Sequence, residues 1–194
     1  MSSEESQNPP PAPDDAFDQV ALEGVPVTVT GGDGDDVLLL DDGFVNTDFI
    51  GGEGDEVDGD LIYAGKMTQG VTVRYTGDEQ GTIDGTGQTV TFSEVERIYL
   101  GEGDDYVAVD APTNGMISGG AGRDILDLGE TPDGEDPPEI TITDERINPD
   151  GSISYSGYVT FPDGSVLQFK DFEKIICFTP GTLIDTDRGP VAVE

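Results

Sequence analysis

Four short segments combine closely spaced glycines with acidic residues. They begin at Gly31, Gly51, Gly101 and Gly119, and each approximates the pattern Gly-Gly-x-Gly-x-Asp-x-U-x, where U is a large apolar residue. Glycine lets the backbone turn sharply enough to aim its carbonyl groups inward. Calcium takes six to eight hard oxygen ligands, from carboxylates and backbone carbonyls. The pattern therefore predicts calcium-binding turns, each followed by a short strand that fills the core.

The candidate calcium ligands come from all four turns. They are Gly31, Asp33, Asp36, Gly51, Glu53, Glu56, Glu102, Asp105, Gly119 and Asp124. The second turn departs from the pattern, because Glu56 stands at the sixth position and Asp58 where an apolar residue belongs. The alternative is that these are acidic turns of a β protein without metal. Four copies in register favour calcium.

These turns resemble those of RTX (repeats-in-toxin, hemolysin-type) proteins. The resemblance implies a short parallel β-roll or solenoid in which a coil takes two nonapeptides, about 18 residues, and calcium lies between stacked turns. Gly51 follows Gly31 by 20 residues, and Gly119 follows Leu100 by 19. We therefore expect each pair to stack, with calcium along one edge only, in two short stacks. The resemblance also implies an extracellular protein exported by type I secretion machinery.

The charge of the chain is extreme. Asp and Glu number 42 against 8 Lys and Arg, which gives a formal net charge of −34, and histidine is absent. Such a chain repels nucleic acid and anionic membrane surfaces, and without histidine it has no Ser-His-Asp triad and no His-based zinc site. Its own repulsion opposes a compact fold. We therefore expect folding to be coupled to calcium binding.

The single cysteine opens a different motif. The last 18 residues resemble the opening of bacterial Hint (hedgehog/intein) domains. The matching residues are Cys177, Gly181, Thr182, Ile184, Thr186, Gly189, Val193 and Glu194. In that family the cysteine thiol attacks the preceding carbonyl, here that of Ile176, and forms a thioester. Only the start of such a module is present, so we expect a fragment of a longer self-processing precursor in which Cys177 is inert towards Ile176. The alternative is a small buried hydrophobic residue.

The remaining pattern is β throughout. Alternating apolar and polar residues predict a strand at 71–75. Two hairpins are predicted, one from 81–83 and 89–92 and one from 158–161 and 166–169, each around a glycine-containing turn. The predicted fold is all-β: a short RTX-like parallel β-roll or solenoid with appended β-hairpins and a disordered acidic N-terminus.

An internal repeat joins distant parts of the chain. The segment Phe92–Ile98 matches Phe169–Ile175 in residue type at seven positions. The repeat leads into two different continuations, a glycine-rich acidic turn after the first copy and the cysteine motif after the second. The alternative is a generic amphipathic strand.

Composition predicts four regions. Residues 1–22 form a disordered leader without a signal peptide, 23–129 the calcium-binding β region, 130–176 a β-hairpin segment, and 177–194 the start of the Hint domain. No apolar run approaches the ~20 residues of a membrane-spanning helix. A structural or adhesive extracellular solenoid without processing is the second interpretation. A hydrolase is disfavoured because no catalytic motif stands out.

Overall fold

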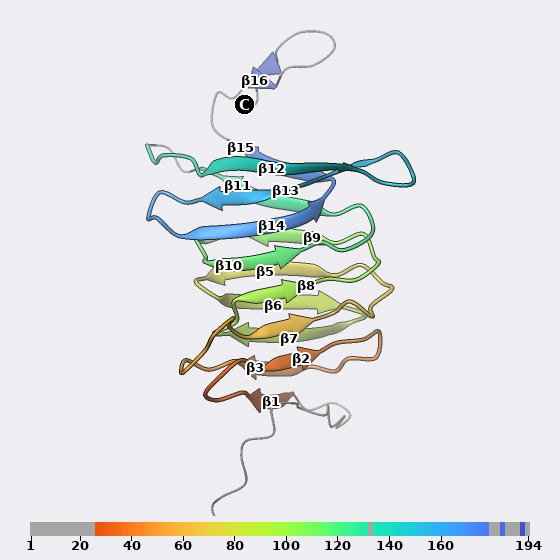
Figure 1. Ribbon diagram of the computed structural model, residues 1–194, viewed down its shortest axis with the longest axis vertical. Coiled ribbons are helices and arrows are strands. Elements are labelled where there is room, and N and C mark those ends of the chain that lie inside the picture. Colours follow the sequence, from red (N-terminus) through yellow and green to blue (C-terminus); the bar gives the residue numbers. More distant parts are fainter. Residues whose placement is uncertain (1–25, 132–133, 179–182, 185–190, 193–194) are drawn as a thin grey trace, which may run out of the picture.

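The computed structural model describes residues 26–131, 134–178, 183–184 and 191–192. All regular structure in these residues is β, as Figure 1 shows. The prediction of an all-β chain is therefore confirmed. The leader predicted for 1–22 and most of the segment 177–194 lie outside the described residues.

Two mixed sheets form the body of the protein. Sheet A has the strand order β1-β3-β7-β6-β5-β9-β11-β15, and sheet B has the order β12-β13-β14-β10-β8-β4-β2. The strands of sheet A are β1 Val27–Thr30, β3 Thr47–Ile50, β5 Thr72–Gly77, β6 Gln80–Gly85, β7 Gln88–Ser93, β9 Tyr106–Val109, β11 Ile125–Glu130 and β15 Lys174–Phe178. Those of sheet B are β2 Val37–Leu39, β4 Leu61–Tyr63, β8 Arg97–Tyr99, β10 Gly115–Ser118, β12 Glu139–Ile147, β13 Ile153–Thr160 and β14 Val166–Phe172. The short strands β16 Leu183–Ile184 and β17 Val191–Ala192 pair with each other.

The chain passes repeatedly from one sheet to the other. Strands β1 to β4 alternate between sheets A and B, and so do β8 to β11. Strands that enter the same sheet in this way pair in parallel, as β2 does with β4 and β9 with β11. Two three-stranded antiparallel meanders interrupt the alternation, β5-β6-β7 in sheet A and β12-β13-β14 in sheet B.

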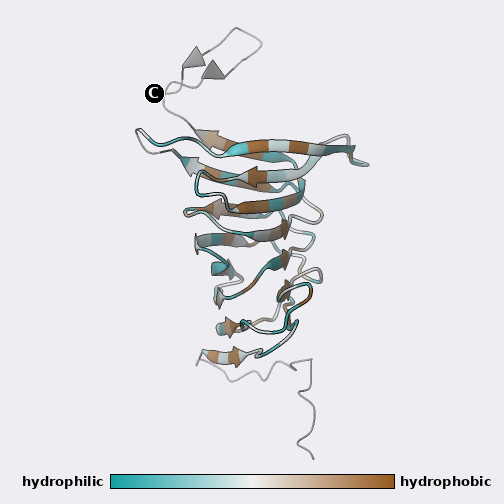
Figure 2. Ribbon diagram, turned by 60° about the vertical axis from the view of Figure 1, so that its left-hand side comes forward, coloured by the Kyte–Doolittle hydropathy of each residue, from teal (hydrophilic) through white to brown (hydrophobic). Residues whose placement is uncertain are grey.

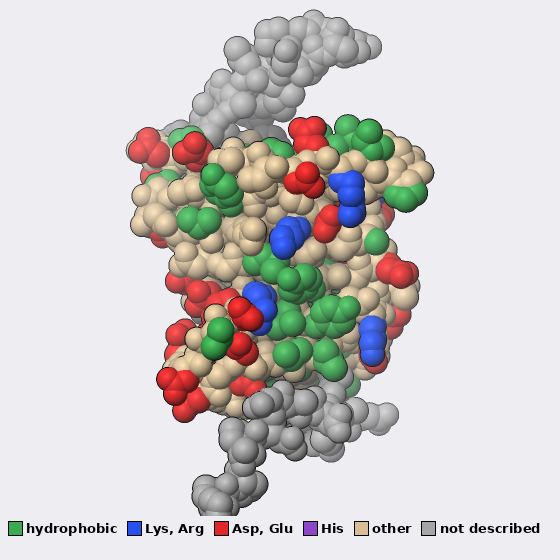
Figure 3. Space-filling view, viewed as in Figure 1, with side chains coloured by type: hydrophobic (Ala, Val, Ile, Leu, Met, Phe, Trp, Pro, Cys, Tyr) green, Lys and Arg blue, Asp and Glu red, His purple; other side chains and the backbone are tan. Residues whose placement is uncertain are grey.

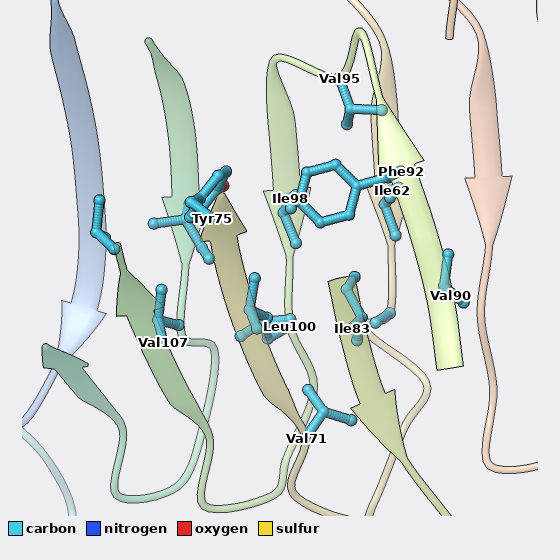
Figure 4. Packing of buried hydrophobic residues seen from close by; sticks show 14 of the residues in the cluster. Ile62, Val71, Tyr75, Ile83, Val90, Phe92, Val95, Ile98, Leu100 and Val107 are labelled. Carbon is cyan, nitrogen blue, oxygen red and sulfur yellow. The ribbon is translucent and has the colours of Figure 1, made fainter. Parts of the chain in front are cut away.

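The core lies between the two sheets and is filled by alternate residues of most of their strands. In sheet B, Leu38, Ile62, Ile98 and Ile117 occupy successive register positions and are almost fully buried. Figure 4 shows Ile62 and Ile98 facing apolar side chains of sheet A, among them Phe92. Figure 2 shows hydrophobic and hydrophilic residues alternating along the strands. This two-residue period anchors the strands that line the core through their inward side chains.

Both predicted hairpins are present. In the first, β6 and β7 pair from Gly81 with Phe92 to Gly85 with Gln88. In the second, β13 and β14 pair from Thr160 with Val166 inward. The strand predicted at 71–75 is β5, displaced by one or two residues.

The internal repeat has a structural counterpart. Glu94 and Asp171 are equivalent in the two copies, and both adopt φ of 57°, an unusual conformation for residues with a side chain. After them the chain crosses to the opposite sheet, from sheet A into β8 in the first copy and from sheet B into β15 in the second. The two copies therefore make the same crossover in opposite directions.

The turn pairs stack as expected, but at two edges rather than one. At the first edge, where the chain passes from sheet A to sheet B, the turns 31–36, 51–60 and 94–96 lie in a row, and Gly32 N donates to Gly51 O over 2.9 Å. At the second edge, where it passes from B to A, Ala121 N donates to Gly101 O over 2.9 Å. The prediction of a single edge is wrong. Successive crossovers alternate between the two edges, and two of them, from β4 to β5 and from β7 to β8, flank the meander β5-β6-β7 between the pairs. The second pair therefore lies at the opposite edge from the first.

The strands on either side of the boundary predicted at 130 belong to the same sheets. Strand β14 pairs in parallel with β10, and β15 pairs in parallel with β11. The segment 130–176 thus contributes a meander to sheet B and an edge strand to sheet A.

Candidate metal centre: acidic turns at the two edges

An acidic residue stands immediately before six of the short parallel strands. These acids are Asp36, Asp60, Glu96, Asp105, Asp124 and Glu173. Two positions after each of them, an apolar side chain faces the core: Leu38, Ile62, Ile98, Val107, Leu126 and Ile175. Burial of the apolar residue fixes the start of the strand, and this in turn holds the acid in the crossover turn.

The acids at the first edge form a hydrogen-bonded ladder. The backbone N–H of Asp36 donates to Oδ1 of Asp60 over 2.7 Å. The N–H of Asp60 donates in turn to Oε2 of Glu96. Each turn is thus joined to the next by a carboxylate that accepts a backbone amide.

The second edge carries a ladder of the same design. Val71 N donates to Oδ1 of Asp105 over 2.7 Å, and Asp105 N donates to Oδ1 of Asp124 over 2.9 Å. Asp124 N donates to Oε2 of Glu173 over 2.8 Å. Each ladder ends on a glutamate of the internal repeat.

Each ladder leaves carboxylate oxygens without a partner. Among the described residues, Oδ2 of Asp60, Asp105 and Asp124 are buried and accept no hydrogen bond, and these side chains are 0, 2 and 0% exposed. Burial, together with neighbouring carboxylates, raises the pKa of each of the three to about 7. A buried charge without a partner is costly. A bound cation would satisfy these atoms, so the turns fit the calcium implied by their residue types.

The first glycine of a turn leaves room for this oxygen. A Cβ at Gly51 would lie 1.9 Å from both Asp60 Oδ2 and the carbonyl oxygen of Glu94. At Gly119 the corresponding atoms are Asp124 Oδ2 at 2.6 Å and the carbonyl oxygen of Asp171 at 2.7 Å. A carboxylate oxygen and a carbonyl oxygen therefore converge on the same glycine at both edges, which is the donor combination that calcium takes.

The structure brings some of the predicted ligands together and leaves others apart. Gly31, Gly51 and Gly119 are the glycines on which carboxylate oxygens converge, and Asp36, Asp105 and Asp124 are buried acids of the ladders. Asp33 and Glu102 are exposed.

Glu56 does not take the sixth-position role assigned to it. The atom beside Gly51 belongs to Asp60, and so does the acceptor of the Asp36 amide. The second turn is longer than the others, and Oδ1 of exposed Asp35 accepts the N–H groups of Val57, at 2.9 Å, and Gly59, at 3.0 Å. The extra residues thus bulge outward, and the ladder resumes at Asp60.

Sequence reasoning missed Asp60, Glu96 and Glu173. Each of them stands two positions before a large apolar residue. The motif of the other turns ends with the same spacing. Glu96 and Glu173 are also equivalent residues of the internal repeat. A search for an acid two positions before a buried apolar residue finds all three.

Cys177 lies on β15, the edge strand of sheet A. Its side chain is half-buried beside an apolar groove of about 550 Å³ that Ile140, Tyr155 and Ile175 also line. Burial, and to a lesser extent Asp127, raises the pKa of its thiol. Ile176, whose carbonyl the thiol would attack, pairs with Asp127 in the parallel ladder of β11 and β15. The neutral thiol and the paired backbone both disfavour attack in this chain.

The chain matches no protein-family model, no curated protein and no solved structure. No helix among the described residues has the length and apolar character that a bilayer crossing requires.

Proposed function

We propose that the protein is a calcium-binding module of the RTX type that folds when calcium binds. The observation that carries the proposal is the set of three buried carboxylate oxygens, on Asp60, Asp105 and Asp124, that have no partner in the described part of the chain. All three lie in stacked glycine-rich turns. Calcium is the common cation whose ligand preference matches carboxylates mixed with carbonyls.

The strand order supports a β-roll as the finer description of the fold. In such a roll the chain coils between two sheets, and stacked turns form its edges. The alternation of β1 to β4 and of β8 to β11 between the two sheets supports this description. The two meanders correspond to the appended hairpins.

Charge supports the coupling of calcium binding to folding. The net charge is −34, yet the described residues contain only two ion pairs, Arg74 with Asp110 and Arg146 with Asp171. Neither pair involves a ladder acid. Calcium at the turns neutralises carboxylates where the chain concentrates them, so binding free energy becomes folding free energy.

The test is a calcium titration of the chelator-treated protein, followed by far-UV circular dichroism, with magnesium as the comparison. A cooperative gain of β signal with calcium and not with magnesium is expected. A chain that is fully folded in chelator and gives the same spectrum with calcium would contradict the proposal.

A matched pair of variants tests whether the turns cause the calcium-dependent folding. Asp124→Asn keeps an acceptor for the Asp105 amide but removes the negative charge at the orphaned oxygen. It should shift the calcium midpoint to higher concentration. Asp136→Asn makes the same change at an exposed position and should leave the midpoint unchanged.

We propose further that the module is secreted by a type I system and forms the N-terminal part of a Hint-containing precursor. Extracellular calcium would then trigger folding after export. The resemblance around Cys177 supports the processing step, and a longer chain that carries the complete second module tests it. Cleavage between Ile176 and Cys177 that a Cys177→Ala variant abolishes is expected; identical behaviour of the two chains would contradict processing.

One observation favours the second interpretation, an adhesive module without processing. The outer face of sheet B carries Leu39, Tyr63 and Tyr158 at 53, 38 and 39% exposure, and Figure 3 shows hydrophobic side chains gathered on this side. Exposed apolar patches commonly mark interaction surfaces. A longer chain that binds calcium and never cleaves would leave this function in place.

A further inference from the structure

The outer face of sheet B carries no acidic side chain along five of its strands. Two rows of residues in register cross β2, β4, β8, β10 and β14 and alternate with buried core residues, so they point outward. One row is Val37, Leu61, Arg97, Met116 and Gln168, and the other is Leu39, Tyr63, Tyr99, Ser118 and Lys170. Asp and Glu account for 42 of the 194 residues, so rows without them set this face apart.

The outer face of sheet A is different. Asp48 on β3 and Asp84 on β6 are exposed there, and Asp127 on β11 alternates with the buried Leu126 and Leu128. The absence of acids is therefore a property of one face and not of the sheets in general.

The apolar part of the sheet B face is open to solvent. Leu39 and Tyr63, which are neighbours in the register of β2 and β4, are 53 and 38% exposed. The ring of Tyr99 follows on β8, with its centroid 6.4 Å from that of Tyr63. Figure 3 shows hydrophobic side chains gathered on this side with basic side chains among them. A contiguous surface of this kind marks a place where another segment binds.

Two basic side chains on this face have no ion-pair partner in the described part of the chain. Arg97 and Lys170 take part in neither of the two ion pairs found there. Arg97 Nη2 donates to the carbonyl of Gly59 over 2.6 Å, and its Nε has no partner among the described residues. A segment that complements this face is therefore both apolar and acidic.

Residues 14–23 have this composition. Their sequence is Asp-Asp-Ala-Phe-Asp-Gln-Val-Ala-Leu-Glu, which interleaves large apolar residues with acids and contains no base. They lie outside the described residues and precede β1 by only a few positions.

The segment starts from the correct end of the protein and is long enough to reach the face. Strands β1 and β2 are edge strands of sheets A and B, and Figure 1 shows them at the same end of the stack. The sheets lie about 10 Å apart and neighbouring strands about 4.8 Å apart, so the path from β1 around to β14 is about 30 Å. An extended chain from residue 25 back to residue 14 spans about 40 Å.

The order of residues along the segment matches the order on the face. Counted back from β1, the apolar Leu22 and Val20 come first, then Asp18, and finally Asp14 and Asp15. Counted from the β2 edge, the face presents apolar side chains on β2 and β4, then the base on β8, and finally the base on β14. Apolar residues can thus meet apolar residues while the acids meet the bases.

We propose that residues 14–23 bind across the outer face of sheet B, with Val20 and Leu22 against Leu39 and Tyr63 and with the acids towards the bases. The short tether gives the segment an effective concentration of about millimolar, so contacts that are individually weak suffice. The contact does not depend on what binds at the glycine-rich turns. A partner that uses this face has to displace the segment.

A single tryptophan reports the contact, because the chain contains none. Phe17→Trp is made in the whole chain, and fluorescence is compared in saturating calcium and in urea. In calcium the emission should lie at shorter wavelength and acrylamide should quench it less. Emission and quenching equal to those in urea would overturn the proposal.

A matched pair of acid insertions locates the contact. In the Phe17→Trp chain, Leu39→Asp places an acid on the face of sheet B, and Thr91→Asp places one at an exposed position of β7 in sheet A. Leu39→Asp should raise quenching towards the value in urea, and Thr91→Asp should leave it unchanged. Equal effects of the two changes would overturn docking on sheet B.

A second pair lies outside the described strands and keeps the test decisive if Leu39→Asp does not fold. Asp18→Lys should raise the quenching of the Trp, because it brings a base towards Arg97 and Lys170. Glu4→Lys makes the same change of charge outside the segment and should not raise it. Equal quenching in these two variants would overturn the charge pairing on which the contact rests. Quenching that rises on dilution would assign the segment to a second copy of the chain and overturn the contact within one chain.

Discussion

Glu96 and Glu173 stand at opposite edges of the protein and make the same contact. Each accepts the backbone N–H of the acid that begins a neighbouring strand, Asp60 in one case and Asp124 in the other. Each is also the fifth residue of one copy of the internal repeat. The repeat therefore supplies the last acceptor of each ladder, first from a crossover out of sheet A and then from a crossover out of sheet B.

Removal of the Glu173 carboxylate should destabilise the second edge. Its oxygens accept from Asp124 N over 2.8 Å and from Asn148 Nδ2 over 3.0 Å. Glu173→Ala leaves both donors without this acceptor, so we expect a loss of about 1–3 kcal/mol in the free energy of unfolding. Urea denaturation in saturating calcium measures it.

Glu173→Gln separates hydrogen bonding from charge. The glutamine carbonyl can still accept the Asp124 amide, so this variant should lose less stability than Glu173→Ala. Glu139→Ala, at an exposed site, serves as the control. Equal losses for Ala and Gln would show that the hydrogen bond is not what stabilises the edge.

The stability of the calcium-free protein should fall as the pH rises. The pKa values of Asp60, Glu79, Asp105 and Asp124 are raised to about 7 in the fold, mainly by burial. Their unfolded values are about 4. Protonation therefore favours the folded state: its contribution is complete below about pH 4 and is lost as the pH rises through about 7.

The β signal of the chelator-treated protein in far-UV circular dichroism measures this effect, and it should be smaller at pH 8 than at pH 5. Exposed Asp35 and Asp42 oppose the trend weakly, because hydrogen bonds lower their pKa values. Calcium should replace protons at the buried acids and flatten the profile. A calcium-free protein that is more stable at pH 8 than at pH 5 would contradict the burial of ionisable ladder acids.

Gly51→Ala should disrupt the second turn. The new Cβ would overlap Asp60 Oδ2 and the Glu94 carbonyl, both of them 1.9 Å away. Overpacking of this kind costs about 1–3 kcal/mol, and displacement of Asp60 should also weaken calcium binding. Gly43→Ala is the matched control, since its nearest neighbour is Asp41 Oδ1 at 3.3 Å. Similar thermal midpoints for the two variants would show that the turn is not closely packed.

Cys177 should react slowly in the folded protein. Burial raises the pKa of its thiol, so the thiolate fraction at pH 8 is small. Labelling with iodoacetamide should be slower in calcium than in urea, and the mass of the chain should show no cleavage after Ile176. Faster labelling of the folded protein would indicate an activated thiol.

The sequence was enough to predict both hairpins but only some of the ladder acids. Local alternation and turn residues were enough for the β6-β7 and β13-β14 hairpins, because their contacts are close in sequence. The motif was enough for Asp36, Asp105 and Asp124 but not for Asp60. Four more residues separate Gly51 from Asp60 than separate Gly31 from Asp36, and motif spacing alone does not show that the insertion bulges outward.

The sequence by itself determined the all-β class, the stacking of the turns in pairs and the oxygen-rich chemistry of the crossovers, because each follows from residue type and short spacing. The tertiary structure decided which edge each pair occupies, since this depends on how many times the chain crosses between the sheets. It also decided that Glu79 meets Glu53 and Glu96. Those carboxylates approach one another because the meander β5-β6-β7 lies between β3 and β9 in sheet A, and this contact joins residues far apart in the chain.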